Sequence, residues 1–439
     1  MSITLSELLR DGGFFCPHCG RFHDITLKSV ITERGAVRRL PEVLAARGIT
    51  RPYLLADTNT WRAAGEAAAA ALTEAGIAFS RHIYSEDHPL PHEHTVGGAL
   101  MHFPADADAV IGIGGGVMGD TAKILASAAK IPYIYVATAP SMDGYASDTS
   151  AMEMDGLKVS LNTVSPETIL LDTDVLTAAP RRMILSGYGD MAAKYVSLVE
   201  WRLAKIILDE YYCPAVADMM RSALDKAADN IEAVLAGDPD AAGILAEGLI
   251  MAGLAMRCAG VSRPASGMEH YISHIRDMRA LAFGTPADLH GIQCGAAALE
   301  VIRAYEKLKK YTPDREKALA AVAAFDYGAH AAYMREKVGP GAEAMIALEA
   351  KEHKYDPAAH AARLTRIIGK WDALCAEMDT LPSSAELEAF MEKIGFPAGL
   401  SALGVGAEER EILFRCGADI RDKYVLTRLM WDLGLPLAE

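Results

Sequence analysis

Three separated motifs in the second half of the chain carry side chains that bind divalent metals. Asp190 lies in GYGDMAAKY, His270 and His274 lie in SGMEHYISH, and His290 lies in DLHGIQCG. His270 and His274 are four residues apart, so on a helix they share one face. One carboxylate and two imidazoles make an open site for a transition metal, with positions left for water and substrate. The same spacing also suits a solvated or core histidine pair, and spacing does not show whether Asp190 and His290 come close.

A glycine-rich segment, GIGGGVMGDTAKILA at 112–126, follows a strand-like run and opens a helical one. Gly114, Gly116 and Gly119 match the spacing G-x-G-x-x-G. Glycines let the backbone approach a pyrophosphate, and a helix N-terminus offers N–H groups and the positive end of its dipole. The segment predicts a dinucleotide site, although a glycine-rich turn can also be structural. It departs from the usual fingerprint because no acidic residue closes the next strand at the expected distance.

Two polar segments also end predicted strands. Asp57 ends PYLLAD, where a carboxylate could hold an adenine-ribose hydroxyl and would repel the 2′-phosphate of NADP. It could equally cap a helix or turn. The segment ATAPSMDGYASDTS at 137–150 follows another strand, at the end where ligands bind in open α/β sheets. Its polar side chains are Thr138, Ser141, Asp143, Ser147, Asp148 and Ser150.

The N-terminal segment CPHCGRFH gives Cys16 and Cys19 the spacing of half a zinc knuckle, with His23 as a candidate third ligand. A structural site needs about four ligands, and the sequence has no second C-x-x-C pair. Reduced thiols without a metal are the alternative. The seven cysteines are odd in number and scattered. Since no export signal is recognisable, we expect free thiols in a reducing cytoplasm.

The pattern of elements changes near residues 173–181. Before that point strand-like and helical runs alternate, which is typical of a parallel sheet. We therefore expect an α/β Rossmann-like parallel-sheet domain over 1–178, an all-α domain over 179–439, and the active site in the cleft between them. The expected strands lie within 24–31, 52–57, 78–84, 108–115, 132–138 and 168–172, with a hairpin over 148–162 that turns at Asp155-Gly156. The helical periodicities after residue 180 are 182–208, 241–260, 266–281, 291–309, 314–336, 342–353, 357–379, 384–393 and 407–431.

Composition narrows the classes of function. Apolar residues make up 51% and charged residues 23%, which is globular. The formal net charge of −15 repels phosphate backbones and anionic lipid, so we expect no nucleic-acid or membrane partner. A local group of cations can still hold a small anionic substrate. The apolar stretch 241–260 is interrupted by Glu247 and Arg257, and we interpret it as a buried core helix.

Five segments together resemble the superfamily of metal-dependent alcohol dehydrogenases and dehydroquinate synthases, and within it the bacterial sn-glycerol-1-phosphate dehydrogenases. They are GGGVMGDTAK, TAPSMDGYAS, GYGDMAAKY, SRPASGMEHYISH and LHGIQCGAA. The resemblance implies a cytoplasmic, commonly homodimeric enzyme of phospholipid biosynthesis. It would reduce dihydroxyacetone phosphate reversibly to sn-glycerol 1-phosphate, with NAD(H) preferred over NADP(H) and one zinc or nickel ion per subunit.

The resemblance also implies roles for single residues. The metal would be bound by Asp190, His270 and His290, and the catalytic residues near the substrate would be Asp143, His274 and Asp190. His274, one helical turn from His270, is suited to a proton relay. NAD would be held by Asp57, Gly116, Val117, Met118, Gly119, Asp120, Thr138, Ala139, Pro140, Ser141 and Ser147. The substrate phosphate needs cations, and those in or beside the motifs are Lys123, Lys158, Lys194 and Arg263.

Three other functions stay open. A dehydroquinate-synthase-like cyclase shares GGGVMGD, but TAPSMDGYAS stands where that family has a VGGKTG-type stretch. Glycerol dehydrogenase acts on the unphosphorylated polyol and fits the H-x-x-x-H spacing less well. A catalytically inactive binding protein on the same fold is disfavoured because every expected ligand position is filled.

Overall fold

The computed structural model describes residues 3–86, 88–154 and 157–437, and the chain forms two compact units. The first contains Met1–Met191 and Asp218–Gly260, and the second contains Ala192–Ala217 and Val261–Glu439. Within the described residues, every strand lies before residue 173, as the sequence predicts. Residues 218–260 are helical but group with the sheet, so the compact units do not divide where the strands end.

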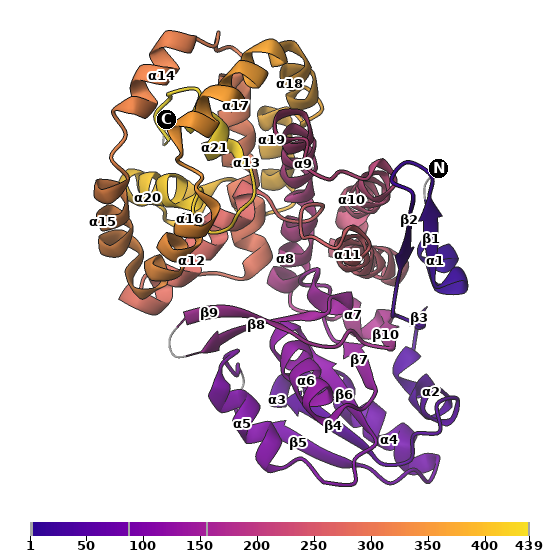
Figure 1. Ribbon diagram of the computed structural model, residues 1–439. Coiled ribbons are helices and arrows are strands. Elements are labelled where there is room, and N and C mark those ends of the chain that lie inside the picture. Colours follow the sequence, from indigo (N-terminus) through magenta and orange to yellow (C-terminus); the bar gives the residue numbers. More distant parts are fainter. Residues whose placement is uncertain (1–2, 87, 155–156, 438–439) are drawn as a thin grey trace. The chain divides into compact units, whose positions relative to one another are not determined.

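The first unit is built on a six-stranded parallel sheet (Figure 1), which confirms the predicted α/β architecture. The four inner strands are buried at every residue, which is why they read as unbroken apolar runs in the sequence. In spatial order the strands are β3 (Ser29–Glu33), β10 (Thr168–Asp172), β7 (Tyr133–Ala137), β6 (Ala109–Gly114), β4 (Pro52–Asp57) and β5 (Ser80–Tyr84).

Helices and short helical turns connect these strands. The core packs Leu54 and Ile111 of the sheet against Leu44 and Leu72 of the helices, all completely buried. The connecting elements are η1 (Ala36–Arg39), α2 (Leu40–Ala45), α3 (Thr58–Thr60), the π-helical turn η2 (Trp61–Gly65), α4 (Glu66–Glu74), α5 (Glu93–Met101), α6 (Gly116–Ala129) and η3 (Gly144–Ala146), and the short helix α7 (Thr173–Thr177) follows the last strand.

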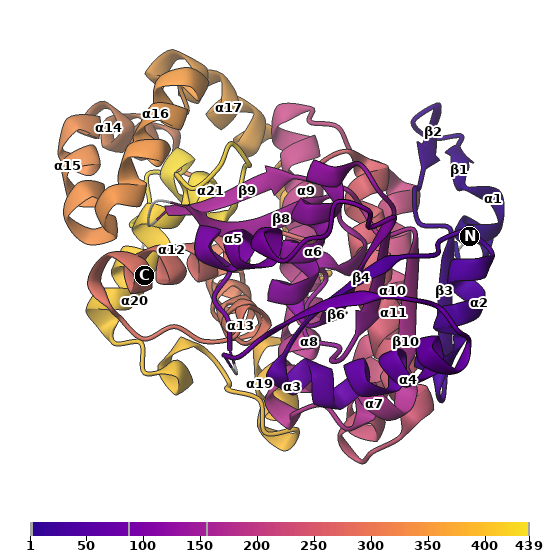
Figure 2. The same ribbon diagram turned by 90° about the horizontal axis from the view of Figure 1, so that it is seen from below.

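Three longer helices complete this part of the chain: α8 (Arg181–Ala192), α10 (Pro214–Leu235) and α11 (Pro239–Ala259). Helix α11 is the apolar stretch of the sequence and packs against α7, η3 and β10. It is the one helix of the described residues that is long and apolar enough to span a membrane, and 78% of its apolar window is buried inside the protein. The prediction of a buried core helix is confirmed. Figure 2 shows α10 and α11 running side by side.

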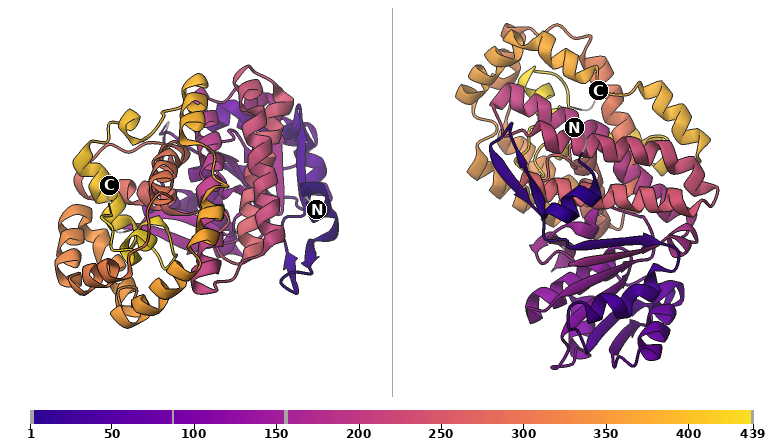
Figure 3. Two further views of the ribbon diagram at one scale, coloured as in Figure 1. Left: turned by 90° about the horizontal axis from the view of Figure 1, so that it is seen from above. Right: turned by 90° about the vertical axis from the view of Figure 1, so that its right-hand side faces the viewer.

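Two antiparallel hairpins lie outside the main sheet. The predicted one is present as β8 (Thr149–Met154) and β9 (Leu157–Asn162), and its expected turn at Asp155-Gly156 lies outside the described residues. The other follows α1 (Leu5–Asp11) and consists of β1 (Gly13–Cys16) and β2 (Arg21–Asp24), which contacts α11 (Figure 3). This second hairpin and helices α1, α5, α7 and α10 were missing from the sequence prediction.

The second unit is helical throughout its described residues, as expected. Three predicted helical stretches within this unit are each divided in two, for example at Asp326, whose side chain caps the new helix by accepting from Ala329 N. The elements are α9 (Lys194–Leu208), α12 (Met268–Phe283), α13 (His290–Leu308), α14 (Arg315–Ala323), α15 (Tyr327–Val338), η4 (Gly339–Gly341), α16 (Ala342–Glu352), α17 (Pro357–Gly369), α18 (Trp371–Met378), α19 (Ser384–Lys393), η5 (Leu400–Leu403), α20 (Ala407–Gly417) and α21 (Leu426–Asp432).

Candidate active site

The predicted cofactor segments meet at one edge of the parallel sheet. Leu55 pairs with Gly112 and Gly114 pairs with Ala137, so strands β4, β6 and β7 end at the same level. The backbone N–H of Thr138 donates to Gly114 O at 3.1 Å. The chain passes from β4 outward to β5 and from β6 the other way to β7, so the strand order reverses between β4 and β6. A crevice at such a reversal is where open α/β sheets bind ligands.

The glycine loop has the geometry that a phosphate site needs. Strand β6 ends at Gly114 and α6 begins at Gly116, with Gly115 in extended conformation between them. A Cβ on Gly114 would lie 2.6 Å from the Cβ of Met118, so the tight turn requires glycine there. The first N–H groups of α6 are therefore presented at the crevice edge, beside the end of β4.

Asp57 acts as a helix cap. Its Oδ1 accepts from Thr60 N at 2.8 Å and begins the short helix α3. Burial raises the pKa of this carboxyl group, against the lowering effect of the Thr60 hydrogen bonds. The capping alternative is thus realised, and contact with a ribose remains a proposal.

The segment 138–147 is held rigidly by its own hydrogen bonds and by helix α8. The Tyr145 hydroxyl donates to Ala139 O and accepts from Ser141 N. The N–H of Asp143 donates to Oδ2 of Asp190 at 2.9 Å. A Cβ on Gly187 of α8 would lie 1.9 Å from Pro140 O, so this helix touches the segment backbone to backbone. The glycine in GYGD therefore lets Asp190 approach Asp143.

Replacing Gly187 by alanine should lower the unfolding free energy by about 1–3 kcal/mol and weaken NAD binding, because Pro140 must move. Denaturant unfolding and cofactor titration measure both effects. Gly97 in α5 is a matched control, since a Cβ there meets nothing within 4 Å. Gly97→Ala should be neutral or stabilising. Equal effects of the two substitutions would contradict the close contact.

Three of the four candidate phosphate cations are buried inside the protein. Lys123 is almost fully buried and donates to Asp120, Gly144 O, Ser147 and Thr149 O. Arg263 is paired with both carboxylate oxygens of Glu210 and donates to Tyr424 O. Lys194 donates to Ala265 O inside the second unit. Lys158, on β9, is partly exposed.

The second unit brings His270 of α12 together with His290 and Cys294 of α13. One donor atom from each lies within 4.8 Å of the others. The ring centroids of His270 and His290 are 5.1 Å apart, and His274 stacks on His290 at 5.9 Å. Burial alone would raise the pKa of the Cys294 thiol, but the two imidazoles outweigh it and lower the pKa from 9.0 to about 7. Imidazole and thiolate donors suit zinc or nickel, so the residues present fit a transition metal.

One buried carboxylate orients His270, and a second one holds the start of its helix. Glu269 Oε1 lies 2.8 Å from Nδ1 of His270 and also accepts from Gly267 N. Glu200 accepts from Met268 N, the first N–H of α12. Together they satisfy the start of α12 and fix the imidazole, because a carboxylate on Nδ1 leaves Nε2 as the ligand atom.

The buried carboxyl groups of Glu200 and Glu269 should make the stability of the fold depend on pH. Burial, followed by the Glu269 charge, raises the pKa of Glu200 from 4.5 to about 8. Since the folded-state pKa lies above the unfolded one, this carboxyl group stabilises the fold fully below pH 4.5 and loses that contribution as pH rises to about 8. Glu200→Gln should flatten the fall in unfolding free energy over this range. Denaturant unfolding of the wild-type protein and the variant across this pH range measures the difference. Parallel curves of unfolding free energy against pH for the two proteins would contradict the prediction.

His290 is positioned by a network between α12 and α13. Gln293 donates to Ser273 at 3.1 Å and to Asp277 at 2.8 Å, and Ser273 lies 3.3 Å from Nδ1 of His290. The sequence prediction named the histidines but missed Glu269, Gln293 and Cys294. The sequence did point to two of them, because Glu269 directly precedes His270 and Cys294 follows His290 by one helical turn. Asp190 belongs to the first unit, and its part in the metal site is a proposal below.

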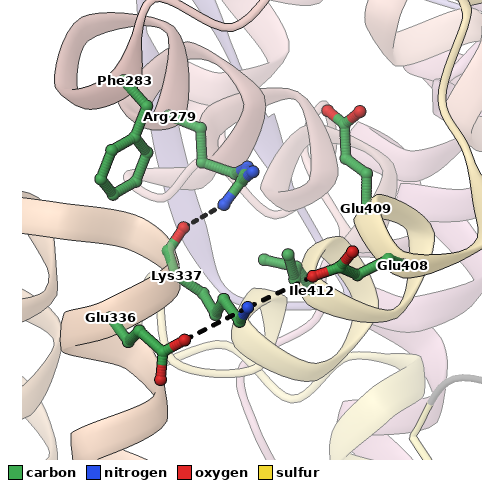
Figure 4. Close-up of a pocket in the computed structure, with 7 residues that line it drawn as sticks. All are labelled: Arg279, Phe283, Glu336, Lys337, Glu408, Glu409 and Ile412. Carbon is green, nitrogen blue, oxygen red and sulfur yellow. Dashed lines mark hydrogen bonds and ion pairs between the residues drawn. The ribbon is translucent and has the colours of Figure 1, made fainter.

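A surface pocket of about 290 Å³ on the second unit does not suit the substrate phosphate (Figure 4). Its lysine, Lys337, pairs with Glu336 and Glu408 at 3.3 and 3.2 Å. Its arginine, Arg279, donates to Lys337 O. A third carboxylate, Glu409, also lines the pocket. Because its cations are already engaged and its carboxylates outnumber them, an anion would be repelled.

Known proteins share this architecture. Residues 31–180 match the family model described as iron-containing alcohol dehydrogenase. The crystal structure of glycerol dehydrogenase from Schizosaccharomyces pombe superposes with a TM-score of 0.55 at 18% identity, covering 93% of this chain and 88% of that chain. The chain therefore has the fold of the iron-containing alcohol dehydrogenases.

Proteins related in sequence identify the family to which the chain belongs within this fold class. Glycerol-1-phosphate dehydrogenase (NAD(P)+) of Halalkalibacterium halodurans is 35% identical over 292 residues, which are 66% of this chain and 73% of the relative. The Bacillus licheniformis protein of the same name is 33% identical over 294 residues, with the same coverage. The chain belongs to the glycerol-1-phosphate dehydrogenase family.

Proposed function

We propose that this chain catalyses the reversible NAD(P)H-dependent reduction of dihydroxyacetone phosphate to sn-glycerol 1-phosphate. The observation that carries the proposal is the cluster of His270, His290 and Cys294, in which Glu269 orients His270. Family membership supports the substrate, because the relatives are named for glycerol 1-phosphate and for NAD(P)+.

We assign Asp190, His270 and His290 as ligands of one divalent ion, zinc or nickel, per subunit. Such an ion supplies Lewis-acid polarisation of the ketone oxygen. Asp190 is completely buried, and the Asp143 N–H holds one of its carboxylate oxygens. This hydrogen bond supports a role as metal ligand, since metal-binding carboxylates are themselves held by hydrogen bonds.

His274 holds the proton that the product hydroxyl receives. It lies one helical turn from His270, with ring centroids 6.4 Å apart, and is partly exposed, so that proton can be replaced from solvent. Asp143 contacts the substrate, and its backbone is fixed by the hydrogen bond to Asp190. Excluding water from this region strengthens each of these polar contacts.

The nicotinamide cofactor binds at the sheet edge of the first unit. The N–H groups at the start of α6 hold the pyrophosphate, which involves Gly116, Val117, Met118, Gly119 and Asp120. The rigid segment 138–147 positions the rest of the nicotinamide cofactor through Thr138, Ala139, Pro140, Ser141 and Ser147. Asp57 contributes negative charge at the end of β4, which favours NADH over NADPH.

The decisive experiment compares NADH oxidation with dihydroxyacetone phosphate and with dihydroxyacetone, each with and without chelator. We expect rapid, chelator-sensitive oxidation with the phosphorylated ketone and sn-glycerol 1-phosphate on chiral analysis. Oxidation only with the unphosphorylated ketone would indicate a glycerol dehydrogenase. No oxidation with either, although metal and cofactor bind, would indicate a cyclase or an inactive binding protein. Elemental analysis identifies the metal, and light scattering tests the homodimer that we also propose, together with a cytoplasmic location.

A further inference from the structure

The N-terminal hairpin β1–β2 buries polar and sulfur-containing side chains while it exposes its aromatic ones. Cys16 and His23 are 0% and 3% exposed, whereas the cross-strand pair Phe15 and Phe22 is 62% and 57% exposed. A two-stranded hairpin with four residues in each strand is at best marginally stable in water. Since its aromatic pair lies in solvent, its inward side chains need another source of stabilisation.

Those inward side chains form a ligand cluster. Cys16 ends β1, Cys19 lies in the turn and His23 lies on β2, and one donor atom from each is within 4.8 Å of the others. The Sγ of Cys19 lies 3.3 Å from Nε2 of His23. The turn is closed by a hydrogen bond from Gly20 N to Cys16 O, and Gly20 has a φ of +66°. This is the folded form of the C-x-x-C half-knuckle in the sequence.

The surroundings fix the histidine for coordination. Nδ1 of His23 lies 2.5 Å from the carbonyl oxygen of Cys258, in the last turn of α11. A carbonyl there keeps the proton on Nδ1 and directs the lone pair of Nε2 toward the two thiols. Arg257 of the same turn pairs with Asp24 at 2.7 Å, which anchors the end of β2. Such an outer shell is typical of zinc-bound histidine.

We propose that Cys16, Cys19 and His23 bind a structural zinc ion. All three residues lie in the first compact unit, and their donor atoms belong to one candidate ligand group. Two thiolates and one imidazole are donors that select zinc, and a fourth ligand completes its tetrahedron. This ion is separate from the catalytic one and independent of the proposed reaction.

The test counts zinc in the purified full-length protein with and without the catalytic site. His270→Ala should retain one zinc ion per chain, and His270→Ala with Cys19→Ser should retain none. Cys375→Ser, at a cysteine outside the cluster, is the control and should leave the count unchanged. A zinc count that Cys19→Ser does not alter would overturn the proposal.

Cobalt spectroscopy decides the question if the cysteine variants fail to fold. The His270→Ala protein loaded with Co²⁺ in place of zinc should show intense thiolate-to-cobalt charge transfer and tetrahedral ligand-field bands. A spectrum without charge-transfer absorption would overturn the site. Cys16→Ser should speed zinc loss to a chelator by at least about tenfold, in line with the loss of one ligand. A wild-type rate of loss would overturn the assignment of Cys16 as a ligand.

Discussion

Replacing His270 by alanine should remove one metal ion per chain and lower turnover about a thousandfold or more. The imidazole is 5% exposed and is one of the three ligands that we assign, so its loss leaves too few donors to hold the ion. Lewis-acid stabilisation of a developing alkoxide contributes several kcal/mol, and each 1.36 kcal/mol is about tenfold in rate. Elemental analysis and steady-state kinetics measure the two effects.

His274→Ala is the matched control, since it removes an imidazole from the same helix one turn away. We expect turnover to fall while the metal content stays at the wild-type value, because His274 handles a proton and is not assigned as a ligand. Loss of metal in both variants would contradict the assignment of His270 as a metal ligand and His274 as a proton-transferring residue. Full metal content in His270→Ala would contradict the metal site itself.

Much of the fold was predictable because its inner strands are buried on both faces. Strands β4 and β10 begin and end where the apolar runs PYLLAD and TILLD do. The hairpin β1–β2 was missed because its inward positions carry cysteine and histidine, which do not give an alternating apolar pattern. Helix α10 has buried residues such as Val216, Met220 and Leu224 at helical spacing, so its absence from the prediction was avoidable.

Some residues of the candidate site can be found from short sequence motifs, whereas others are recognised only from the fold. Motif spacing was enough to find His270, His274 and His290, because each lies within a short segment of one helix. Glu200 could not be found this way, since it is far from α12 in sequence and reaches Met268 N only through the packing of α9 on α12. Lys123 was one of four candidate phosphate cations because it lies in the glycine-loop motif, and only the fold shows its four internal acceptors.

Replacing Lys123 by alanine should lower the unfolding free energy by about 3–5 kcal/mol, because it leaves a buried charge without its partner. The Asp120 carboxylate is 13% exposed and lies 3.2 Å from Nζ of Lys123. Burial raises the pKa of Asp120, and Lys123 is the main group that lowers it again. The same ammonium also joins α6 to Gly144 O and Thr149 O, so NAD affinity should fall as well. Denaturant unfolding and cofactor titration measure the two losses.

Two further variants separate the buried charge from a simple loss of packing. Lys130→Ala removes an exposed lysine at the end of the same helix and should change stability by less than about 0.5 kcal/mol. Adding Asp120→Asn to Lys123→Ala should restore part of the lost stability, since a neutral amide costs less to bury than an unpaired carboxylate. If the double variant were less stable than Lys123→Ala, the ammonium would act mainly through the backbone carbonyls of the 144–149 segment. Lys123 would then hold the cofactor loop in place rather than compensate Asp120.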